Sequence, residues 1–455
     1  MYTWTLLIAL SLEVLWSANE ESIILKFPLP PLSQQVFTGH STALGAVEEC
    51  LSRIAEQDPA VQSFVALRED AALEEARELD AMTSRGPLHG IPFAVKDIFD
   101  TASLPTEYNS ELYRGHQAEE DAQVVTLLRR AGAILLGKVS TVEFAGMGNL
   151  PSTRNPHHLA HSPGGSSSGS GAAVGAGMVP LAIGSQTGGS TIRPAAYCGA
   201  VGFKPTWGLV SCLGMKSFAP SLDTVGFIGD TSELMVRVLA AVKGVADPSG
   251  WPNYEDQRSS LRVGVYLTHY IAEASPCVID ALTKLSAQLT DAGHSVEEVA
   301  DPFAGNDINA IQDIVMWGEG LESMRTELTE CPDQLSDAVL SALRPHRKLA
   351  ATTIADARAA LARVRLQCDK AMSSYDVWLT PAVADVAPLL TEGNGAATFN
   401  RLFTALHVPC VTLPVSLGAN NLPLGLQLVA ARDTDQQLIK AAAVIERVIN
   451  AGRAH

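Results

Sequence analysis

The sequence has few charged residues, no excess of basic residues and no patterned cysteines. Only 18% of its 455 residues are charged and 47% are apolar, which argues against disorder and indicates a large buried core. The net charge of -17 disfavours nucleic acid or an anionic membrane as a partner. The seven cysteines are scattered, odd in number and free of CxxC spacing, so we expect neither a disulfide framework nor a structural zinc site. Reduced thiols favour a cytoplasmic protein.

The chain also lacks a long apolar run, an internal repeat and a clean interdomain linker. Segment 4–16 is mostly apolar but too short to span a bilayer. It resembles the apolar part of a signal peptide, although no basic residue precedes it and Glu13 lies inside it. A surface helix or a wrongly chosen start codon also explains it, and secretion is the weaker alternative. We divide the chain into an N-terminal segment and linker, 1–40, and one large domain, 41–455.

Apolar spacing alternates between helical and extended patterns along the chain. Helices are expected over 43–54, 69–82, 121–131, 233–243, 277–291, 354–371 and 435–448. Strands are expected over 91–95, 133–137, 263–266, 377–380, 411–415 and 424–429. This alternation predicts an α/β architecture.

One lysine and two serines lie in glycine-rich contexts. Lys96 follows the expected strand 91–95, Ser166 lies in a Ser/Gly run over 162–177, and Ser190 follows two glycines. A serine nucleophile needs a base, and a lysine can be that base only when it is buried and neutral. Glycines beside a nucleophile let backbone N–H groups approach an oxyanion. The three residues together predict a hydrolase that uses Ser–Ser–Lys chemistry.

Each of these features also has an ordinary structural explanation. Lys96 alone would be expected to form an ion pair with Asp97 or Asp100. A lone Gly-Gly-Ser is commonly a simple turn. The run 162–177 has the composition of a flexible linker. It passes directly into the apolar segment 172–183, however, which favours an ordered active-site loop.

Further motifs extend over nearly the whole chain. They are Leu104-Pro105-Thr106, Asp121-Ala122, Ala131-Gly132-Ala133, Gly137-Lys138, Glu143-Phe144, Asn155-Pro156, Gly202-Phe203-Lys204-Pro205-Thr206, Ser221-Leu222-Asp223-Thr224-Val225-Gly226, Tyr375-Asp376-Val377-Trp378-Leu379-Thr380-Pro381 and Leu422-Pro423-Leu424-Gly425-Leu426-Gln427. With the Lys96, Ser166 and Ser190 motifs, they identify the chain as resembling the amidase signature family. The resemblance implies a single large α/β domain, a mixed twisted β-sheet flanked by helices.

The resemblance also assigns roles to individual residues. Ser190 corresponds to the nucleophile, Lys96 to the base, and Ser166 to a bridging serine whose peptide bond with Gly165 is cis. The spacing of 24 residues between the two serines agrees with the family. The oxyanion hole would be formed by the backbone N–H groups of Thr187, Gly188, Gly189 and Ser190.

Two departures from the common family pattern concern substrate binding. Gln186 stands where many members carry Asp, and Arg193 lies three residues after the nucleophile instead of two. Together with Ser168, these features resemble the malonamidase-type branch, in which the matching arginine binds a substrate carboxylate. Gln186 and Arg193 are therefore candidate substrate-binding residues. It is an equally weighted alternative that Arg193 ties the loop to a buried carboxylate or carbonyl.

The rest of the acyl pocket is poorly determined by the sequence. Family pockets draw on the segment around 300–350 and on the loop around Asn400-Arg401-Leu402. Met316, Trp317 and Leu321 have helical spacing and are candidates for an apolar pocket, although core packing explains such spacing more often.

The function expected from the resemblance is hydrolysis of a small-molecule amide C–N bond through an acyl-enzyme on Ser190. No metal or organic cofactor is implied, the partner is a small amide or carbamate, and a homodimer is compatible. A carbamate (urethane) or ester hydrolase would use the same residues. A glutaminase-type subunit of a tRNA-dependent amidotransferase is less favoured because of Gln186, Arg193 and the acidic surface. A catalytically inactive binding protein is disfavoured because Lys96, Ser166 and Ser190 are all present.

Overall fold

The structure is a computed structural model that describes residues 30–82, 86–146, 148–245 and 260–453. Segment 4–16, whose nature the sequence leaves open, lies outside these ranges. Within them, no helix combines the length and apolar character that a bilayer-spanning helix requires.

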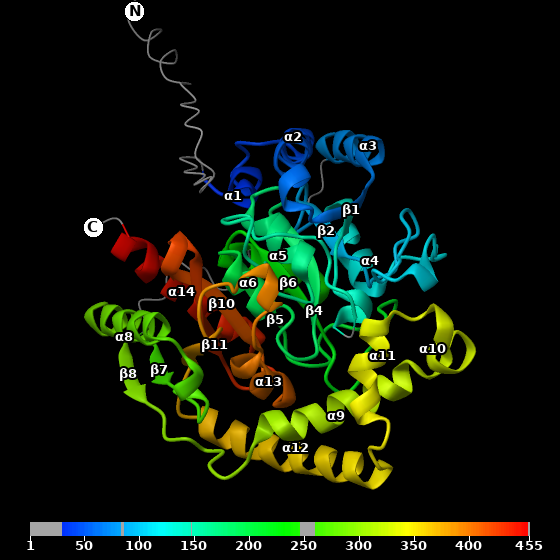
Figure 1. Ribbon diagram of the computed structural model, residues 1–455. Helices are drawn as coiled ribbons and strands as arrows, with labels where there is room; N and C mark the ends of the chain where they lie inside the picture. The colour runs from blue at the N-terminus through cyan, green and yellow to red at the C-terminus, as the bar shows by residue number, and fades with distance from the viewer. Residues whose placement is uncertain (1–29, 83–85, 147, 246–259, 454–455) are drawn as a thin grey trace, which may run out of the picture.

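One mixed sheet of 11 strands runs through the molecule (Figure 1). The strands are β1 (Phe64–Leu67), β2 (Pro92–Lys96), β3 (Ile134–Val139), β4 (Leu181–Gln186), β5 (Val201–Lys204), β6 (Thr224–Gly229), β7 (Arg262–Val265), β8 (Ser295–Glu298), β9 (Val377–Pro381), β10 (Cys410–Leu417) and β11 (Pro423–Val429). Their order is β1-β3-β2-β4-β6-β5-β10-β11-β9-β7-β8. β2 is parallel to both β3 and β4, whereas β4 and β6 are antiparallel. The expected mixed α/β fold is confirmed.

Helices surround the sheet. They are α1 (Leu32–Phe37), α2 (Ala43–Val61), α3 (Glu69–Asp80), α4 (Gln123–Arg130), α5 (Ser168–Gly175), α6 (Ile192–Tyr197), α7 (Ser232–Val242), α8 (Pro276–Asp291), α9 (Ile308–Ser323), α10 (Arg325–Glu330), α11 (Asp337–Leu343), α12 (Ala351–Met372), α13 (Thr398–Ala405) and α14 (Asp435–Arg453). Figure 1 shows α9 and α12 side by side below the sheet, with α2 and α3 at the opposite end of the molecule. α9 also packs against α13, which places both helices close to the carboxyl end of β4.

The central strands are buried on both faces. Every residue of β2, β3, β4 and β6 is buried, which is why they read as continuous apolar runs without alternation. These four strands nevertheless contain two charged residues that are also buried: Lys96 at the end of β2 and Lys138 in β3. A buried charge requires a partner or the loss of its proton.

Part of the segment expected to be a linker is helical and partly buried. Residues 32–37 fall within the expected linker but form α1, in which Leu32, Ser33 and Val36 are buried. Ser33 donates hydrogen bonds to Asp230 from its backbone N–H (3.0 Å) and its hydroxyl (2.5 Å). These two contacts join α1, within the segment expected to be a linker, to Asp230 of the core.

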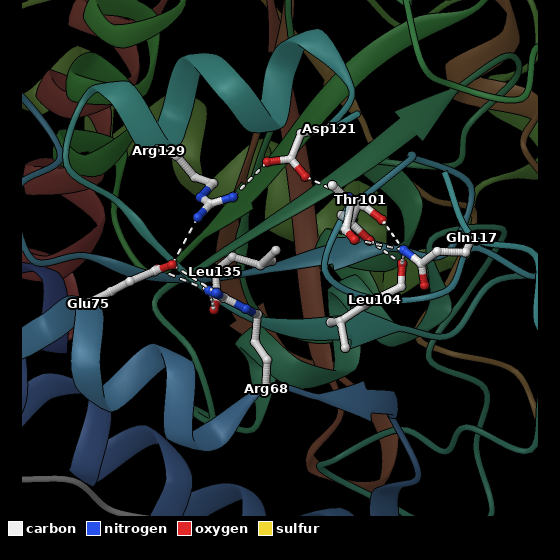
Figure 2. A network of polar contacts seen from close by, with 9 residues as sticks. Arg68, Glu75, Thr101, Leu104, Gln117, Asp121, Arg129 and Leu135 are labelled. Atoms are coloured by element: carbon white, nitrogen blue, oxygen red, sulfur yellow. Dashed lines mark hydrogen bonds and ion pairs between the residues drawn. The ribbon is translucent and has the colours of Figure 1, made fainter. Parts of the chain in front are cut away.

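A charged network fixes the segment that follows β2 (Figure 2). Glu75 of α3 accepts from both Arg68 (2.8 Å) and Arg129 (2.9 Å), and Arg129 of α4 also pairs with Asp121 (2.7 Å). Asp121 accepts from the backbone N–H of Ala102 at 2.8 Å. The network thereby joins α3 and α4 to the chain that leaves the end of β2.

Candidate active site

Lys96 lies at the carboxyl end of β2, beside the end of β4. Because these strands are parallel and Val95 pairs with Ile183, their ends meet at the same edge. Lys96 Nζ lies 2.8 Å from Ser166 Oγ and 2.8 Å from Ser185 Oγ. The structure thus brings Lys96 and Ser166 together as the motif predicts, and adds Ser185, which the sequence analysis did not identify.

Neither Asp97 nor Asp100 pairs with Lys96 among the described residues. In the β2–β3 register Lys96 pairs with Val139 and Val95 with Lys138, so the two lysines project from opposite faces of the sheet. Asp97 lies on the Lys138 side, where its Oδ1 is 3.0 Å from Lys138 Nζ. The ion-pair explanation of Lys96 is therefore wrong, because Asp97 serves Lys138.

The environment of Lys96 favours its neutral form. Burial lowers the pKa of its amine to about 7, and the negative charge of Asp223 opposes that shift. Asp223 is itself occupied by hydrogen bonds from Thr187 Oγ1 (2.6 Å), Ser217 Oγ (2.6 Å) and two backbone N–H groups. A substantial fraction of Lys96 is then unprotonated near neutral pH, as a general base requires.

The Ser/Gly run is ordered and buried. Ser166 lies just before α5, and its peptide bond with Gly165 is cis, as the resemblance implies. The helix that follows is composed of small residues because its neighbours are close: a Cβ on Gly169 would lie 2.4 Å from Ser140 N. A flexible linker is therefore excluded for this segment. Ser168 donates to the carbonyl of Gly164 at 2.8 Å and closes the loop.

The loop that carries Ser190 presents free backbone N–H groups. Those of Thr187, Gly188, Gly189 and Ser190 have no hydrogen-bond partner among the described residues. This is the arrangement that an oxyanion hole requires.

Two helices orient the carbonyls of this loop. The Gln312 side chain of α9 donates to Thr187 O at 2.9 Å, and Thr404 Oγ1 of α13 donates to Gly188 O at 2.7 Å. In a trans peptide the C=O and N–H point in opposite directions. The N–H groups of Gly188 and Gly189 therefore point away from these donors.

Ser190 and Ser166 line one cavity of about 640 Å³. No hydrogen bond joins the two hydroxyls within the described part of the chain. Catalytic hydrogen bonds are often long before substrate binds. The structure thus places both serines at one site but does not link them directly.

The cavity is lined by both apolar and charged residues. The apolar residues include Val142, Ala145, Leu150, Phe218, Met316 and Trp317, and the charged residues are Arg193, Glu273, Asp307, Asp313 and Arg401. Met316 and Trp317 are pocket residues, as considered from their spacing. Leu321, the third candidate, is not among the lining residues and packs against the core.

Gln186 and Arg193, the two candidate substrate-binding residues, both hydrogen-bond to the backbone near the two serines. Gln186 is buried and outside the cavity lining; its Oε1 accepts from the N–H groups of Thr191 and Ile192 at 3.0 Å each, and its Nε2 donates to Thr404. It therefore shapes the turn after Ser190. The Arg193 guanidinium donates to the carbonyls of Gly165 (2.6 Å) and Gly395. The structure thus agrees with the alternative that Arg193 ties loops together.

Comparison with known proteins identifies the family of this chain. The amidase family model matches residues 45–439. This chain belongs to the amidase family. Among curated relatives, one of the subunits of the glutamyl-tRNA(Gln) amidotransferase of Anaeromyxobacter dehalogenans is 34% identical over 88% of this chain and 92% of its own length.

Two solved amidase structures also match. A crystal structure of an amidase is 29% identical with a TM-score of 0.82, covering 91% of this chain and 98% of the other. The native peptide amidase from Stenotrophomonas maltophilia is 26% identical with a TM-score of 0.78, covering 93% and 98%. The 11-stranded sheet is thus the amidase fold, and the chain is an amidase-family hydrolase.

Proposed function

We propose that this amidase-family hydrolase cleaves a small-molecule amide C–N bond through an acyl-enzyme on Ser190, with Lys96 as the base and Ser166 as the proton relay. One observation supports this most strongly. The Lys96 amine is buried, has no carboxylate partner among the described residues, and lies 2.8 Å from Ser166 Oγ.

The reaction begins with two proton transfers. Neutral Lys96 accepts the proton of Ser166, which accepts the proton of Ser190 as the Ser190 oxygen attacks the carbonyl carbon. The N–H groups of the 187–190 loop stabilise the oxyanion that forms. When the carbonyl re-forms, the C–N bond breaks and the proton returns through Ser166 to the leaving nitrogen.

The second half regenerates the enzyme. Water attacks the acyl-enzyme carbonyl, passes its proton to the relay, and releases a carboxylic acid from Ser190. The products are that acid and ammonia or a free amine. Every step uses side chains and backbone groups of this chain.

Active-site labelling tests the proposal. A serine-directed fluorophosphonate should attach to Ser190, as located by peptide mass spectrometry, and Ser190→Ala should abolish both labelling and turnover. kcat/KM should be measured on primary amides, p-nitroanilides, carbamates and esters, which share this mechanism and differ in leaving group. Failure to label Ser190 in folded protein would instead favour an inactive binding protein.

A second candidate has a specific observation behind it. Several relatives that match about nine-tenths of the chain are named as one of the subunits of glutamyl-tRNA(Gln) amidotransferase. This chain would then hydrolyse glutamine within a larger complex that acts on tRNA. Glutaminase activity that appears only with a co-purifying protein would establish that function; activity of the isolated chain on small amides would favour the first.

A further inference from the structure

The peptide group between Gly188 and Gly189 supplies one of the free N–H groups of the 187–190 loop. This peptide is trans, so the N–H of Gly189 points away from the carbonyl of Gly188. Because neither residue carries a Cβ, the backbone itself restricts the rotation of this peptide plane very little. The direction of the Gly189 N–H therefore depends on what the Gly188 carbonyl contacts.

A single hydroxyl holds that carbonyl. Among the described residues, only Thr404 Oγ1 of α13 donates to Gly188 O, at 2.7 Å, and both residues are buried. The same hydroxyl lies 3.1 Å from the carbonyl of Asn400, one turn earlier in α13. A hydroxyl has one proton, which the shorter contact assigns to Gly188.

Gln186 determines how the Thr404 hydroxyl is used. Its Oε1 accepts the backbone N–H groups of Thr191 and Ile192, and because these groups can only donate, this atom must be the oxygen of the amide. Its Nε2 is then a donor only, and it lies 3.0 Å from Thr404 Oγ1. Thr404 must accept from Gln186, which leaves the hydroxyl proton for a carbonyl. The hydrogen bonds thus run in one direction, from Gln186 through Thr404 to Gly188.

A side chain at position 186 that can only accept would reverse this direction. A carboxylate there would still accept the N–H groups of Thr191 and Ile192, but it would also accept the proton of Thr404. The Gly188 carbonyl would then lose its donor, and the peptide plane between the two glycines would lose the contact that orients it. The donor capacity of residue 186 therefore matters as well as its shape.

We infer that Gln186 and Thr404 are positioning residues of the oxyanion hole: the amide N–H of Gln186 directs the Thr404 proton to Gly188 O, and this aims the Gly189 N–H at the oxyanion. The inference rests on the proposed function, because it requires an oxyanion to form beside Ser190. Gln186 then acts without touching the substrate, in agreement with its place outside the cavity lining.

A double-mutant cycle on the best substrate of the amide panel tests the inference. Gln186→Glu keeps the shape and the acceptor but removes the amide donor, and Thr404→Val keeps the shape but removes the hydroxyl. Each should lower kcat and kcat/KM together, by about 10-fold to 100-fold, with little change in KM, because the oxyanion forms only in the reaction. In the Thr404→Val background, the loss caused by Gln186→Glu should be about 5-fold smaller or less, since the hydroxyl through which it acts is gone.

Two further variants serve as controls. Thr412 is fully buried, donates its hydroxyl to the carbonyl of Leu426 at 2.9 Å and does not line the cavity. Thr412→Val loses the same kind of hydrogen bond and should leave kcat/KM unchanged. Thr404→Ser keeps the hydroxyl and should retain most of the wild-type kcat. Urea unfolding checks each fold, and Thr404→Ala removes the same hydroxyl if Thr404→Val does not fold.

The outcomes separate this inference from the proposed function. Equal losses from Gln186→Glu in the wild-type and Thr404→Val backgrounds would overturn the directed chain of hydrogen bonds. Wild-type kcat in folded Thr404→Val, or a rise in KM alone, would overturn the positioning role. These results leave the Ser190 mechanism intact, whereas a folded wild type that hydrolyses no amide would contradict the proposed function itself.

Discussion

Lys96 and Lys138 are both fully buried on neighbouring strands, yet they have different partners. Lys96 Nζ contacts two hydroxyls, those of Ser166 and Ser185. Lys138 Nζ contacts the Asp97 carboxylate at 3.0 Å, Thr106 Oγ1 at 2.6 Å and two backbone carbonyls. Burial lowers the pKa of both lysines; Asp223 opposes the shift of Lys96 through its charge alone, whereas Asp97 opposes that of Lys138 through both its charge and a hydrogen bond.

The difference follows from strand geometry. Adjacent positions of the β2–β3 register project to opposite faces, so one face receives Asp97 and the other receives the serines. The same side-chain type therefore pairs with a carboxylate on one face and contacts hydroxyl groups on the other, where we propose that it accepts a proton. Its role is decided by which neighbour the backbone places there.

Replacing Lys96 should have the largest effect on catalysis. Lys96→Met is expected to lower kcat/KM by about 10³-fold, because the proton of Ser190 loses its acceptor. Its effect on the free energy of unfolding should be smaller than that of Lys138→Met. Steady-state kinetics and urea unfolding of both variants measure the two effects. An equal loss of activity in folded Lys138→Met would contradict the proposed difference in role between the two lysines.

Replacing Lys138 should affect stability most. Lys138→Met leaves the buried Asp97 carboxylate without its partner and should lower the free energy of unfolding by about 3–5 kcal/mol. Adding Asp97→Asn should recover part of this loss, since no charge then remains buried. If the double variant is less stable than the sum of the two single variants predicts, the pair does not act as proposed.

Loss of the contact that orients Thr187 O should give an intermediate effect on catalysis. Gln312→Leu is expected to lower kcat about 10-fold to 100-fold, less than removal of an oxyanion donor itself. Affinity for a trifluoromethyl ketone, which mimics the tetrahedral intermediate, should weaken in parallel, while the inhibition constant of the product acid should change little. Equal weakening for both ligands would indicate general disruption of the pocket instead.

The pH dependence of stability should show the smallest change per pH unit, and the most specific one. Above pH 7 the folded protein holds Lys96 unprotonated, whereas the unfolded chain keeps its proton up to about pH 10.5. The unfolded state binds more protons in this window, so wild-type stability relative to Lys96→Met should rise with pH, by at most about 1.4 kcal/mol per pH unit. Urea unfolding at several pH values measures it; a constant difference would mean that Lys96 stays charged.

Much of the site could be predicted from the sequence, for identifiable reasons. Lys96, Ser166 and Ser190 lie in local sequence motifs, and the spacing of apolar residues predicts the alternation of helices and strands. The partner of Lys96 could not be predicted, because it depends on strand register and on which face each side chain occupies. Ser185 was missed because the apolar run through 172–183 conceals where α5 ends and β4 begins.

Other features depend on contacts between distant segments. Gln312 and Thr187 are 125 residues apart in the chain, and no local pattern marks Gln312 as a donor to the oxyanion loop. The sequence does not decide whether Arg193 binds a substrate carboxylate or a backbone carbonyl. In the structure its guanidinium donates to the carbonyls of Gly165 and Gly395. The ion pair between Arg401 and Asp313 likewise forms only when α9 and α13 are placed together.

The most direct test of an uncharged Lys96 is the pH dependence of acylation at Ser190. The rate of fluorophosphonate labelling should be followed from pH 5.5 to 10.5, with chemistry limiting, in the wild type and in Lys96→Met. The rate should rise through a single ionisation near pH 7 and reach a plateau, and the rise should vanish in the variant. A rate that is flat from pH 6 to 10, or that rises only as a free lysine loses its proton above pH 10, would contradict the mechanism.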